Sequence, residues 1–244
     1  MGTDRIVFFD SGVGGLTLMK DFLRRYPFAR CAYFGDNENA PYGNRAEEDI
    51  RRLASRAFER IAAVSPRAAV IACNTVTAEC ADVLRRKYPF PIVGVEPAIR
   101  PAAAAAGQGR ILLLATRATL ARARVRELIG KNQAAGGIEK YCPARLAGEI
   151  EKNIFSLADV RLADHLPRGN YAAVVLGCTH YIFLRERIQK FYSCPVFDGN
   201  SGTADHLATI TNICFENFQK NEKNAPIFLG KSAKFNESVY ISMK

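Results

Sequence analysis

The sequence predicts an α/β protein of two pseudo-symmetric α/β lobes with mainly parallel sheets and an active site in the cleft between them. Two observations lead to this fold class. Short apolar runs alternate with longer amphipathic segments, which is typical of parallel β-α units. Three of the apolar runs also recur in the same order between 103 and 106 residues later in the chain of 244.

The expected elements follow the apolar pattern in chain order. Strands are expected at residues 6–9, 31–34, 68–72, 92–95, 111–115, 173–176 and 195–197. Helices are expected at residues 16–25, 47–63, 77–87, 119–130 and 184–191.

The repeat is carried by segments that end at equivalent positions. AAVIAC (68–73) matches AVVLGC (173–178) at an offset of 105, and IVFFD (6–10) matches LLLAT (112–116) at an offset of 106. VGV and VFD, which begin at Val93 and Val196, lie 103 apart. Buried parallel strands resemble one another by chance, so chance similarity stays an alternative. Three matches in order favour two related lobes.

Polar or thiol side chains follow four of these strands. Asp10, Cys73 and Thr116 each come directly after an expected strand, and Cys178 comes two residues after one. In open parallel sheets, ligands bind at the carboxyl ends of the strands. Two facing lobes would bring these ends together, so we expect the active site there.

The composition excludes several classes of protein. Apolar residues make up 48% and charged residues 24%, which fits a globular chain rather than a disordered one. The apolar runs are too short to span a bilayer, and the N-terminal segment has no signal core. We therefore expect a cytoplasmic protein with no membrane partner. Seven cysteines, an odd number, favour free thiols over a disulfide framework.

The formal charge of +10 raises the question of an anionic partner. The basic residues are scattered, and they match no nucleic-acid motif, so nucleic acid is not expected as a partner. Solvated helix faces explain the charge, and steering of a dianionic substrate is a second explanation.

A glycine-rich turn, DSGVGG (10–15), follows the first expected strand. It is not a dinucleotide fingerprint, because the third glycine position falls on Thr17, and no lysine–serine/threonine pair makes it a P-loop. Two interpretations stay open. The turn presents Asp10 and Ser11 at a strand end, with N–H groups free to hold an anion, or it is a plain strand–helix turn capped by Ser11.

Two cysteines occupy equivalent places in the repeat, Cys73 in ACNT and Cys178 in GCTH. Each follows an apolar strand and precedes small hydrogen-bonding side chains suited to a helix N-terminus, where the thiol pKa is expected to be lowered. A single cysteine there is usually structural, but two at matching positions favour a catalytic pair. His180 is a candidate proton partner for Cys178.

Zinc binding is the other common use of cysteine and histidine. Cys73 and Cys80 are seven apart, and Cys178 lies two before the nearest histidine, so neither pair has the C-x-x-C spacing. No metal site is therefore expected. His165 and His206 lie in polar contexts and are expected to be exposed.

A loop containing proline and glycine, APYGN (40–44), follows the strand that ends in YFGD. An ordinary turn explains this loop without any function. Its residues Tyr42 and Gly43 become candidates only in the company of the other motifs.

Taken together, FDSGVGGLT, the NAPYG loop, ACNT and LGCTHY resemble the glutamate racemase family, within the wider aspartate/glutamate racemase group. VGVEPA, from Val93, is similar to the family's segment that leads into the second lobe. The resemblance runs from residue 6 to about residue 200. It implies a first lobe of residues 1–96 and 204–244 and a second lobe of residues 97–203. It also implies an amino-acid racemase with no cofactor, frequently a homodimer.

The resemblance implies roles at matching positions. Cys73 resembles the base that acts on the D-enantiomer, and Cys178 resembles the base that acts on the L-enantiomer. Asp10 and His180 resemble the polar partners of these two cysteines and complete the expected catalytic set. Substrate contacts are expected from Asp10, Ser11, Tyr42, Gly43, Asn74, Thr75, Thr179 and His180.

The chain departs from the family pattern in two places. Ile182 stands where the family often has proline. The family's second-lobe pattern, C-P-x-F-V-P-L-V-E, appears here as CPARLAGEIE, so the expected glutamate falls on Ile150. The carboxylate near Cys178 is therefore either Glu149 or Glu151. Beyond about residue 217 no family motif is found.

Racemisation requires that a proton leave one face of the α-carbon and that another return to the opposite face. Two thiols on opposing strand ends supply this geometry, one as thiolate and one as thiol, and each well-matched acid/base group contributes about 10²- to 10⁴-fold. N–H groups and hydroxyls around Ser11, Asn74 and Thr179 are expected to stabilise the carbanion. The expected substrate is glutamate, and the expected role is to supply D-glutamate for peptidoglycan.

Three alternatives stay open from the sequence. An aspartate racemase has the same motifs, because the length of the substrate side chain cannot be read from these residues. A decarboxylase or cis–trans isomerase acting on a dicarboxylate is a second alternative, although a decarboxylase needs only one protonating cysteine. A non-enzymatic protein that senses an amino acid is the third, and the presence of both Cys73 and Cys178 argues against it.

Overall fold

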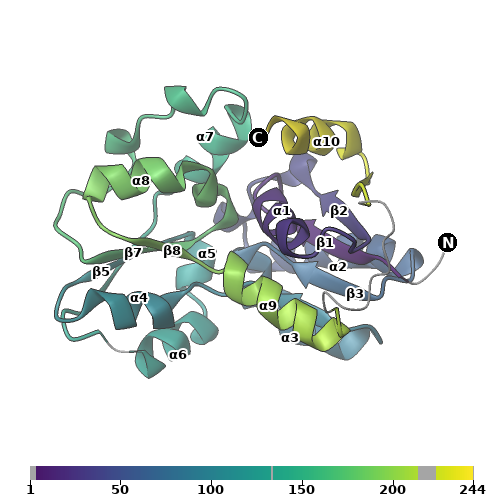
Figure 1. Ribbon diagram of the computed structural model, residues 1–244, viewed down its shortest axis with the longest axis horizontal. Coiled ribbons are helices and arrows are strands. Elements are labelled where there is room, and N and C mark those ends of the chain that lie inside the picture. The colour runs from purple at the N-terminus through teal and green to yellow at the C-terminus, as the bar shows by residue number, and fades with distance from the viewer. Residues whose placement is uncertain (1–3, 133, 214–223, 244) are drawn as a thin grey trace.

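The computed structural model describes residues 4–132, 134–213 and 224–243. Figure 1 shows two twisted sheets side by side, with helices packed on both faces of each. Every strand pair in both sheets is parallel. None of the helices within the described ranges is long and apolar enough to cross a membrane.

The first sheet has the strand order β4-β3-β1-β2-β9. Its strands are β1 (Ile6–Asp10), β2 (Cys31–Gly35), β3 (Ala68–Ile71), β4 (Ile92–Gly94) and β9 (Ile227–Leu229). The second sheet has the order β6-β5-β7-β8. Its strands are β5 (Ile111–Ala115), β6 (Ile138–Tyr141), β7 (Ala173–Gly177) and β8 (Val196–Asp198).

The repeat found in the sequence is also a repeat of topology. The offsets of 106, 105 and 103 relate β1 to β5, β3 to β7 and β4 to β8, and these strands are neighbours in the same order in both sheets. The fourth pair is β2 and β6. The sequence pattern missed β6, because its residues, IEKY, are half polar on a sheet edge that is only partly buried. Two pseudo-symmetric α/β lobes with parallel sheets are therefore confirmed.

The helices of the first half are α1 (Leu16–Arg25), α2 (Glu47–Ala63) and α3 (Asn74–Lys87). Those that follow are α4 (Ile99–Ala106), α5 (Arg117–Leu120), α6 (Ala123–Lys131), α7 (Leu146–Lys152), α8 (Arg185–Tyr192), α9 (Asn200–Thr211) and α10 (Ala233–Ser242). Short 3-10 helices include η1 (Asn37–Asn39), η2 (Tyr42–Asn44) and η5 (Thr179–Leu184).

Two of the expected helices differ from those observed in ways that bear on the site. Helix α3 begins three residues earlier than expected, so Cys73 immediately precedes its first residue. The single helix expected at residues 119–130 is wrong, because α5 and α6 are separate. Thr116 caps α5 by accepting a hydrogen bond from the Thr119 N–H, and the chain becomes extended again at Arg122.

One apolar core runs through both lobes. Phe8 and Val70 of the first sheet belong to the same buried cluster as Leu112 and Leu176 of the second. The opposite faces of the two sheets have separate cores, one beneath α2 and α3 and one beneath α4 and α6. The shared core holds the carboxyl ends of the two sheets against each other.

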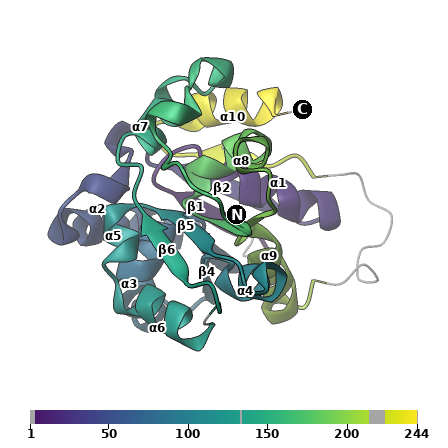
Figure 2. The same ribbon diagram turned by 90° about the vertical axis from the view of Figure 1, so that its left-hand side faces the viewer.

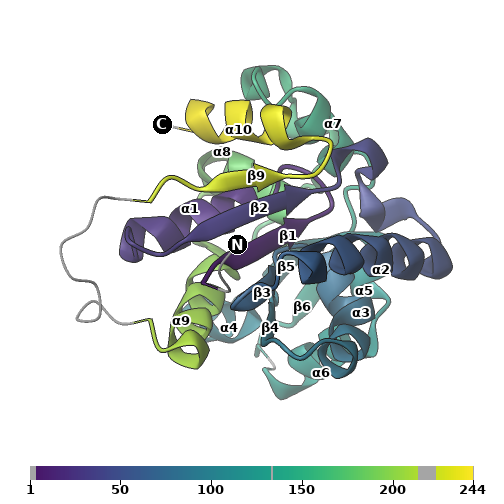
Figure 3. The same ribbon diagram turned by 90° about the vertical axis from the view of Figure 1, so that its right-hand side faces the viewer.

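The C-terminal part of the chain lies against the first sheet. Strand β9 pairs with β2, and α10 lies over this edge in Figure 3. Arg25 of α1 pairs with Asp205 of α9 at 2.6 Å. We propose that residues 1–96 and 204–244 form the first lobe and residues 97–203 the second, and these contacts support that division.

Candidate active site

The carboxyl ends of the central strands of both sheets meet at one enclosed pocket. Cys73 follows β3, Thr116 follows β5, and Cys178 follows β7. The pocket is lined by Ser11, Pro41, Tyr42, Gly43, Cys73, Asn74, Thr75, Thr116, Ala147, Cys178, Thr179 and His180. Every expected site residue except Asp10 is in this lining, and Pro41, Thr116 and Ala147 were not among the expected contacts.

The pocket is closed. Its cavity volume is about 10 Å³, which is room for about one water molecule. Cys73 and Cys178 are each 6% exposed. An amino acid can enter only if the segments that line the pocket move apart.

The glycine-rich turn after β1 packs directly against the second lobe. A Cβ on Gly12 would lie 2.5 Å from Glu151 Oε2, and one on Gly14 would lie 2.4 Å from Thr179 Oγ1. The Val13 N–H donates to Glu151 Oε2 at 3.1 Å. The anion that this turn holds is therefore a carboxylate of the protein itself. Glycine is required because another lobe's side chains occupy the space of a Cβ.

Cys73 lies in acidic surroundings. Its Sγ is 3.5 Å from Ser11 Oγ, and the Asp10 carboxyl lies close by. Burial and the charge of Asp10 raise the pKa of the Cys73 thiol to about 12, although hydrogen bonds from Ser11 and the Val76 N–H act the other way. The lowered pKa expected at this helix N-terminus is therefore wrong for Cys73 in the closed site, because burial has the larger effect. Cys73 is a thiol at neutral pH.

Asp10 joins the two lobes beneath the pocket. It is fully buried, its Oδ1 accepts from the Gly12 N–H at 2.9 Å, and its Oδ2 accepts from Thr179 Oγ1 at 2.9 Å. Burial raises the pKa of Asp10, and the positive charge of His180 partly opposes this effect. Asp10 thus supports the lining residues rather than lining the pocket itself.

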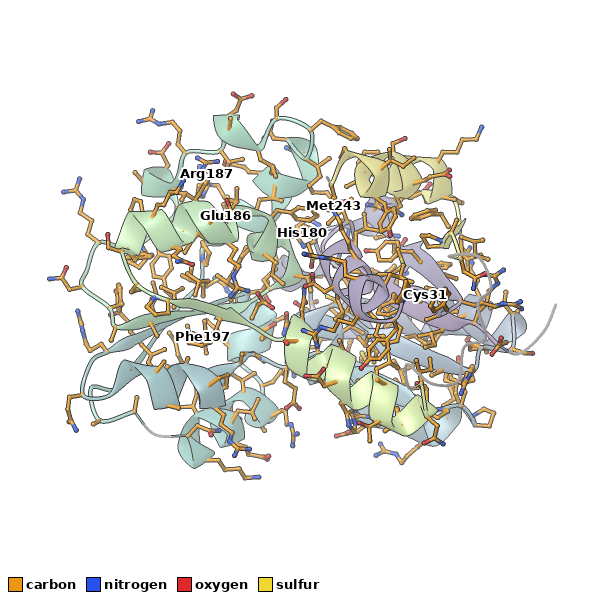
Figure 4. All side chains as sticks on the ribbon, in the orientation of Figure 1. Cys31, His180, Glu186, Arg187, Phe197 and Met243 are labelled. Atoms are coloured by element: carbon orange, nitrogen blue, oxygen red, sulfur yellow. The ribbon has the colours of Figure 1, made fainter. Side chains whose placement is uncertain are left out.

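Cys178 has a cationic partner. Its Sγ lies 4.0 Å from His180 Nδ1, and His180 Nε2 lies 2.6 Å from Glu151 Oε2. Burial opposes a charged imidazole, but the hydrogen bonds to Cys178 and Glu151 outweigh it and hold the pKa of His180 well above its usual value. Burial also acts to raise the pKa of Glu151. The hydrogen bond and charge of His180, together with hydrogen bonds from the Val13 N–H and Asn37, have the larger effect and lower this pKa. Figure 4 places His180 where the two lobes meet.

The geometry distinguishes the two candidate glutamates on α7. Glu151 contacts His180, whereas Glu149 lies 2.8 Å from His165 Nε2. Ile150 between them is fully buried, so its neighbours face different directions on the helix. The expectation that His165 is exposed is wrong: it is 6% exposed, because the Glu149 carboxylate pairs with its ring. His206 is exposed, as expected.

Comparison with known proteins agrees with this arrangement. The model of the Asp/Glu/Hydantoin racemase family matches residues 24–207. The glutamate racemase of Clostridium botulinum is 38% identical over 212 residues, which cover 83% of this chain and 81% of that protein. The glutamate racemase of Leptospira borgpetersenii is 37% identical over 215 residues, 84% of this chain and 81% of that one.

The chain belongs to the Asp/Glu/hydantoin racemase family. It is an amino-acid racemase. Two solved structures have the same fold. Glutamate racemase RacE1 from Bacillus anthracis has a TM-score of 0.75 and 27% identity over 92% of this chain and 86% of that one. Glutamate racemase from Escherichia coli, in complex with L-glutamate and the activator UDP-MurNAc-Ala, has a TM-score of 0.75 and 27% identity over 99% and 94%.

Hydroxyl and amide groups fill the side of the racemase pocket near Cys73. Thr75 Oγ1 and Thr116 Oγ1 are 3.0 Å apart across the lobe boundary, and a Cβ on Gly43 would lie 2.4 Å from the Thr116 methyl group. The Tyr42 hydroxyl donates to Asp36 at 2.5 Å, away from the cysteines. Asn74 Nδ2 is buried and has no hydrogen-bond acceptor within the described part of the chain. An unpaired donor in the pocket lining is suited to an anionic ligand.

A metal ion is the other ligand that histidine, cysteine and carboxylate side chains could hold. No group of three histidine, cysteine, aspartate or glutamate side chains within residues 4–132, 134–213 and 224–243 is close enough to hold a metal ion. Sequence reasoning left Glu149 and Glu151 as alternatives, and it missed Asn37, which donates to Glu151 Oε1 at 2.6 Å. Asn37 belongs to no motif, so only its place beside the second lobe reveals it.

Proposed function

We propose that this racemase interconverts L- and D-glutamate without a cofactor, with Cys73 and Cys178 as opposed acid/base groups. The observation that carries the proposal is the pair of strand-end thiols, one from each lobe, in one closed pocket. The substrate is proposed from the relatives, since proteins 34–38% identical to this chain are named glutamate racemases. The complex of the Escherichia coli enzyme with L-glutamate supports the same substrate.

In the proposed reaction, the Cys178 thiolate removes the α-proton of L-glutamate. The C–H bond breaks, its electron pair stays on the substrate as a carbanion, and an S–H bond forms on Cys178. The Cys73 S–H bond then breaks as its proton adds to the opposite face of the α-carbon, which yields D-glutamate and a Cys73 thiolate. The reverse reaction begins from that thiolate and ends with Cys178 protonating the L-face.

The neighbours of the cysteines suit these steps. His180 lies beside Cys178, with Nδ1 4.0 Å from its Sγ, and is placed to exchange a proton with this group. Cys73 is held as a thiol and is ready to donate a proton. Asn74 Nδ2, which has no acceptor among the described residues, and the Thr75 hydroxyl supply hydrogen bonds to the substrate carboxylates and to the developing carbanion, whereas the Thr179 hydroxyl is engaged with Asp10.

The test is an assay of optical rotation and of α-proton exchange in D₂O across glutamate, aspartate, asparagine and a hydantoin. Purified protein that has been dialysed with chelator is expected to racemise glutamate, and the double C73S/C178S variant provides the background. A preference for aspartate, or an activity restored only by added metal or pyridoxal phosphate, would contradict the proposal.

We also propose that the protein acts in the cytoplasm, as a homodimer, and that its D-glutamate is used for peptidoglycan. Expression of the chain should restore growth without added D-glutamate to a bacterium that lacks its own glutamate racemase. The C73S variant is the control. Light scattering during gel filtration measures the oligomer, and a mass of 26.9 kDa at all concentrations would exclude the dimer.

A further inference from the structure

Behind Glu151, on the side away from the pocket, three buried polar atoms have no hydrogen-bond partner among the described residues. They are Asn37 Oδ1 and both amide atoms of Asn236. Asn236 lies on the C-terminal helix α10 and is fully buried. A buried polar group without a partner destabilises the fold, so its presence in a native structure indicates a role other than stability.

These atoms surround one point. The Cβ position of Gly35 lies 2.7 Å from Asn236 Nδ2, 2.8 Å from Asn37 Oδ1 and 2.7 Å from the Gly12 carbonyl oxygen. A donor of Asn236 and an acceptor of Asn37 therefore both face the space that a side chain at Gly35 would fill, with no direct hydrogen bond between them. A small rotation or one bridging water joins them.

The amide nitrogen of Asn37 already has a hydrogen-bond acceptor. Its Nδ2 donates to Glu151 Oε1 at 2.6 Å, and Glu151 Oε2 lies 2.6 Å from His180. Hydrogen bonds thus run from Asn37 through Glu151 to the imidazole beside Cys178, and Asn236 of α10 faces the outer end of this line across the space beside Gly35. Figures 1 and 2 show α10 beside α7, the helix that carries Glu151.

A contact between two aromatic rings joins α10 to the segment that follows α7. Phe235 of α10 and Phe155, which follows α7, have centroids 6.1 Å apart in an edge-to-face arrangement. Phe235 directly precedes Asn236 in the chain. The contact places the residue next to Asn236 against the segment that follows α7, across the boundary between the lobes.

We infer that Asn236 and Asn37 are positioning residues for the Cys178 acid/base group: Asn236 holds Asn37, and Asn37 holds the Glu151 carboxylate against His180. The expected effect on proton abstraction by Cys178 rests on the proposed function, whereas the expected effect on the position of the Glu151 carboxylate does not. Hydrogen bonds that end in a charge-assisted pair strengthen one another in a buried site, so loss of the outer member weakens the inner one.

A positioning role for Asn236 predicts a variant that keeps its stability but loses activity. Replacing Asn236 by leucine, which is similar in shape, removes two buried polar atoms that have no direct partner among the described residues, and this gain offsets the loss of the bridge to Asn37, so the melting temperature should change little. The same change should loosen Glu151. A residue with only a structural role would not show this combination.

The kinetic test uses the L- and D-forms of an amino acid with a leaving group on the β-carbon, so that proton abstraction leads to elimination. Racemisation itself is unsuitable, because its equilibrium constant of one forces kcat/KM to change equally in both directions. N236L is expected to slow elimination from the L-form about tenfold through kcat, with little change for the D-form. S238A, on the exposed side of α10, is the matched control.

A second readout needs no activity. The His180 ring faces Cys178, Glu151 and Asp10, and its NMR titration reports how firmly Glu151 is held. N236L and the more exposed N37A should both lower the pKa of His180, and their effects should not add in the double variant.

The outcomes separate the two proposals. An unchanged His180 titration in both variants, or equal loss of elimination from both enantiomers, would overturn the positioning role. A lowered pKa of His180 together with a wild-type protein that does not act on glutamate would support the positioning role and refute the proposed function.

Discussion

Cys73 and Cys178 follow equivalent strands, β3 and β7, of two lobes with the same strand order. Their neighbours are nevertheless opposite in charge. Cys73 lies near the Asp10 carboxyl, and Cys178 lies 4.0 Å from the His180 imidazole. The repeated fold thus sets where the two thiols lie, and the residues around them set the charge that each thiol faces.

The supporting groups cross between lobes. Asp10 of the first lobe accepts a hydrogen bond from Thr179 of the second, and Glu151 of the second accepts one from the Val13 N–H of the first. Each cysteine site is therefore complete only when the lobes are closed.

The largest expected effect comes from removing either thiol. C73S and C178S should each lower racemisation by about 10²-fold or more, because each removes a general acid/base group. With an analogue that eliminates a β-substituent, C73S should prefer the L-form and C178S the D-form. The same preference in both variants would remove the opposed-base model, whereas a reversed preference would correct only the assignment.

The next comparison is between the two glutamates of α7. E151Q should lower elimination from the L-form by about tenfold or more, because His180 loses its charged partner. It should also lower the free energy of unfolding by about 3 kcal/mol, the cost of breaking a buried ion pair from one side. E149Q is the matched control, and because the Glu149 side chain is 39% exposed, its contact with His165 should contribute less than about 1 kcal/mol. Equal effects on the L-form in the two variants would show that Glu151 has no special role.

The pair of His180 and Glu151 predicts a pH window. Because the pKa of His180 is raised on folding, its contribution to stability is present below its unfolded value and is lost as pH rises through the folded value. The pKa of Glu151 is lowered, so its contribution is present above its unfolded value and is lost as pH falls through the folded value. Urea unfolding of wild type and H180Q should therefore differ most between the usual pKa values of the two groups, 4.5 and 6.5, and converge at both extremes of pH. A constant difference from acid to alkaline pH would contradict the charged pair.

The smallest effect concerns the glycine turn. G12A places a Cβ against the Glu151 carboxylate and should destabilise the protein by about 1–3 kcal/mol while impairing elimination from the L-form more than from the D-form. G202A, on α9, has no atom within 4 Å of the new Cβ and should change neither quantity. Thermal unfolding and the elimination assay measure both, and equal impairment of the two enantiomers would indicate a general loss of packing.

Much of the fold follows from local pattern. Apolar runs with turn signals predicted the central strands. The bounds of α1 and α2 were predicted correctly, because the apolar residues of each helix recur at the helical period within the segment itself. The strands β6 and β9 were missed, since both lie at sheet edges where half-polar residues are tolerated. Helix α10 was missed because it has no pronounced apolar face, and its one fully buried polar residue is Asn236.

The sequence by itself determined that two thiols follow matched strands and that polar residues accompany them. Only the tertiary structure decided between Glu149 and Glu151, because burial of Ile150 sets the rotation of α7. It also decided that Cys73 is a thiol, since burial and the nearby Asp10 outweigh the helix N-terminus. The physical reason is common to these cases. Periodicity and spacing are local, whereas burial, charge pairing and the fit of Gly12 against Glu151 depend on which residues of the other lobe pack nearby.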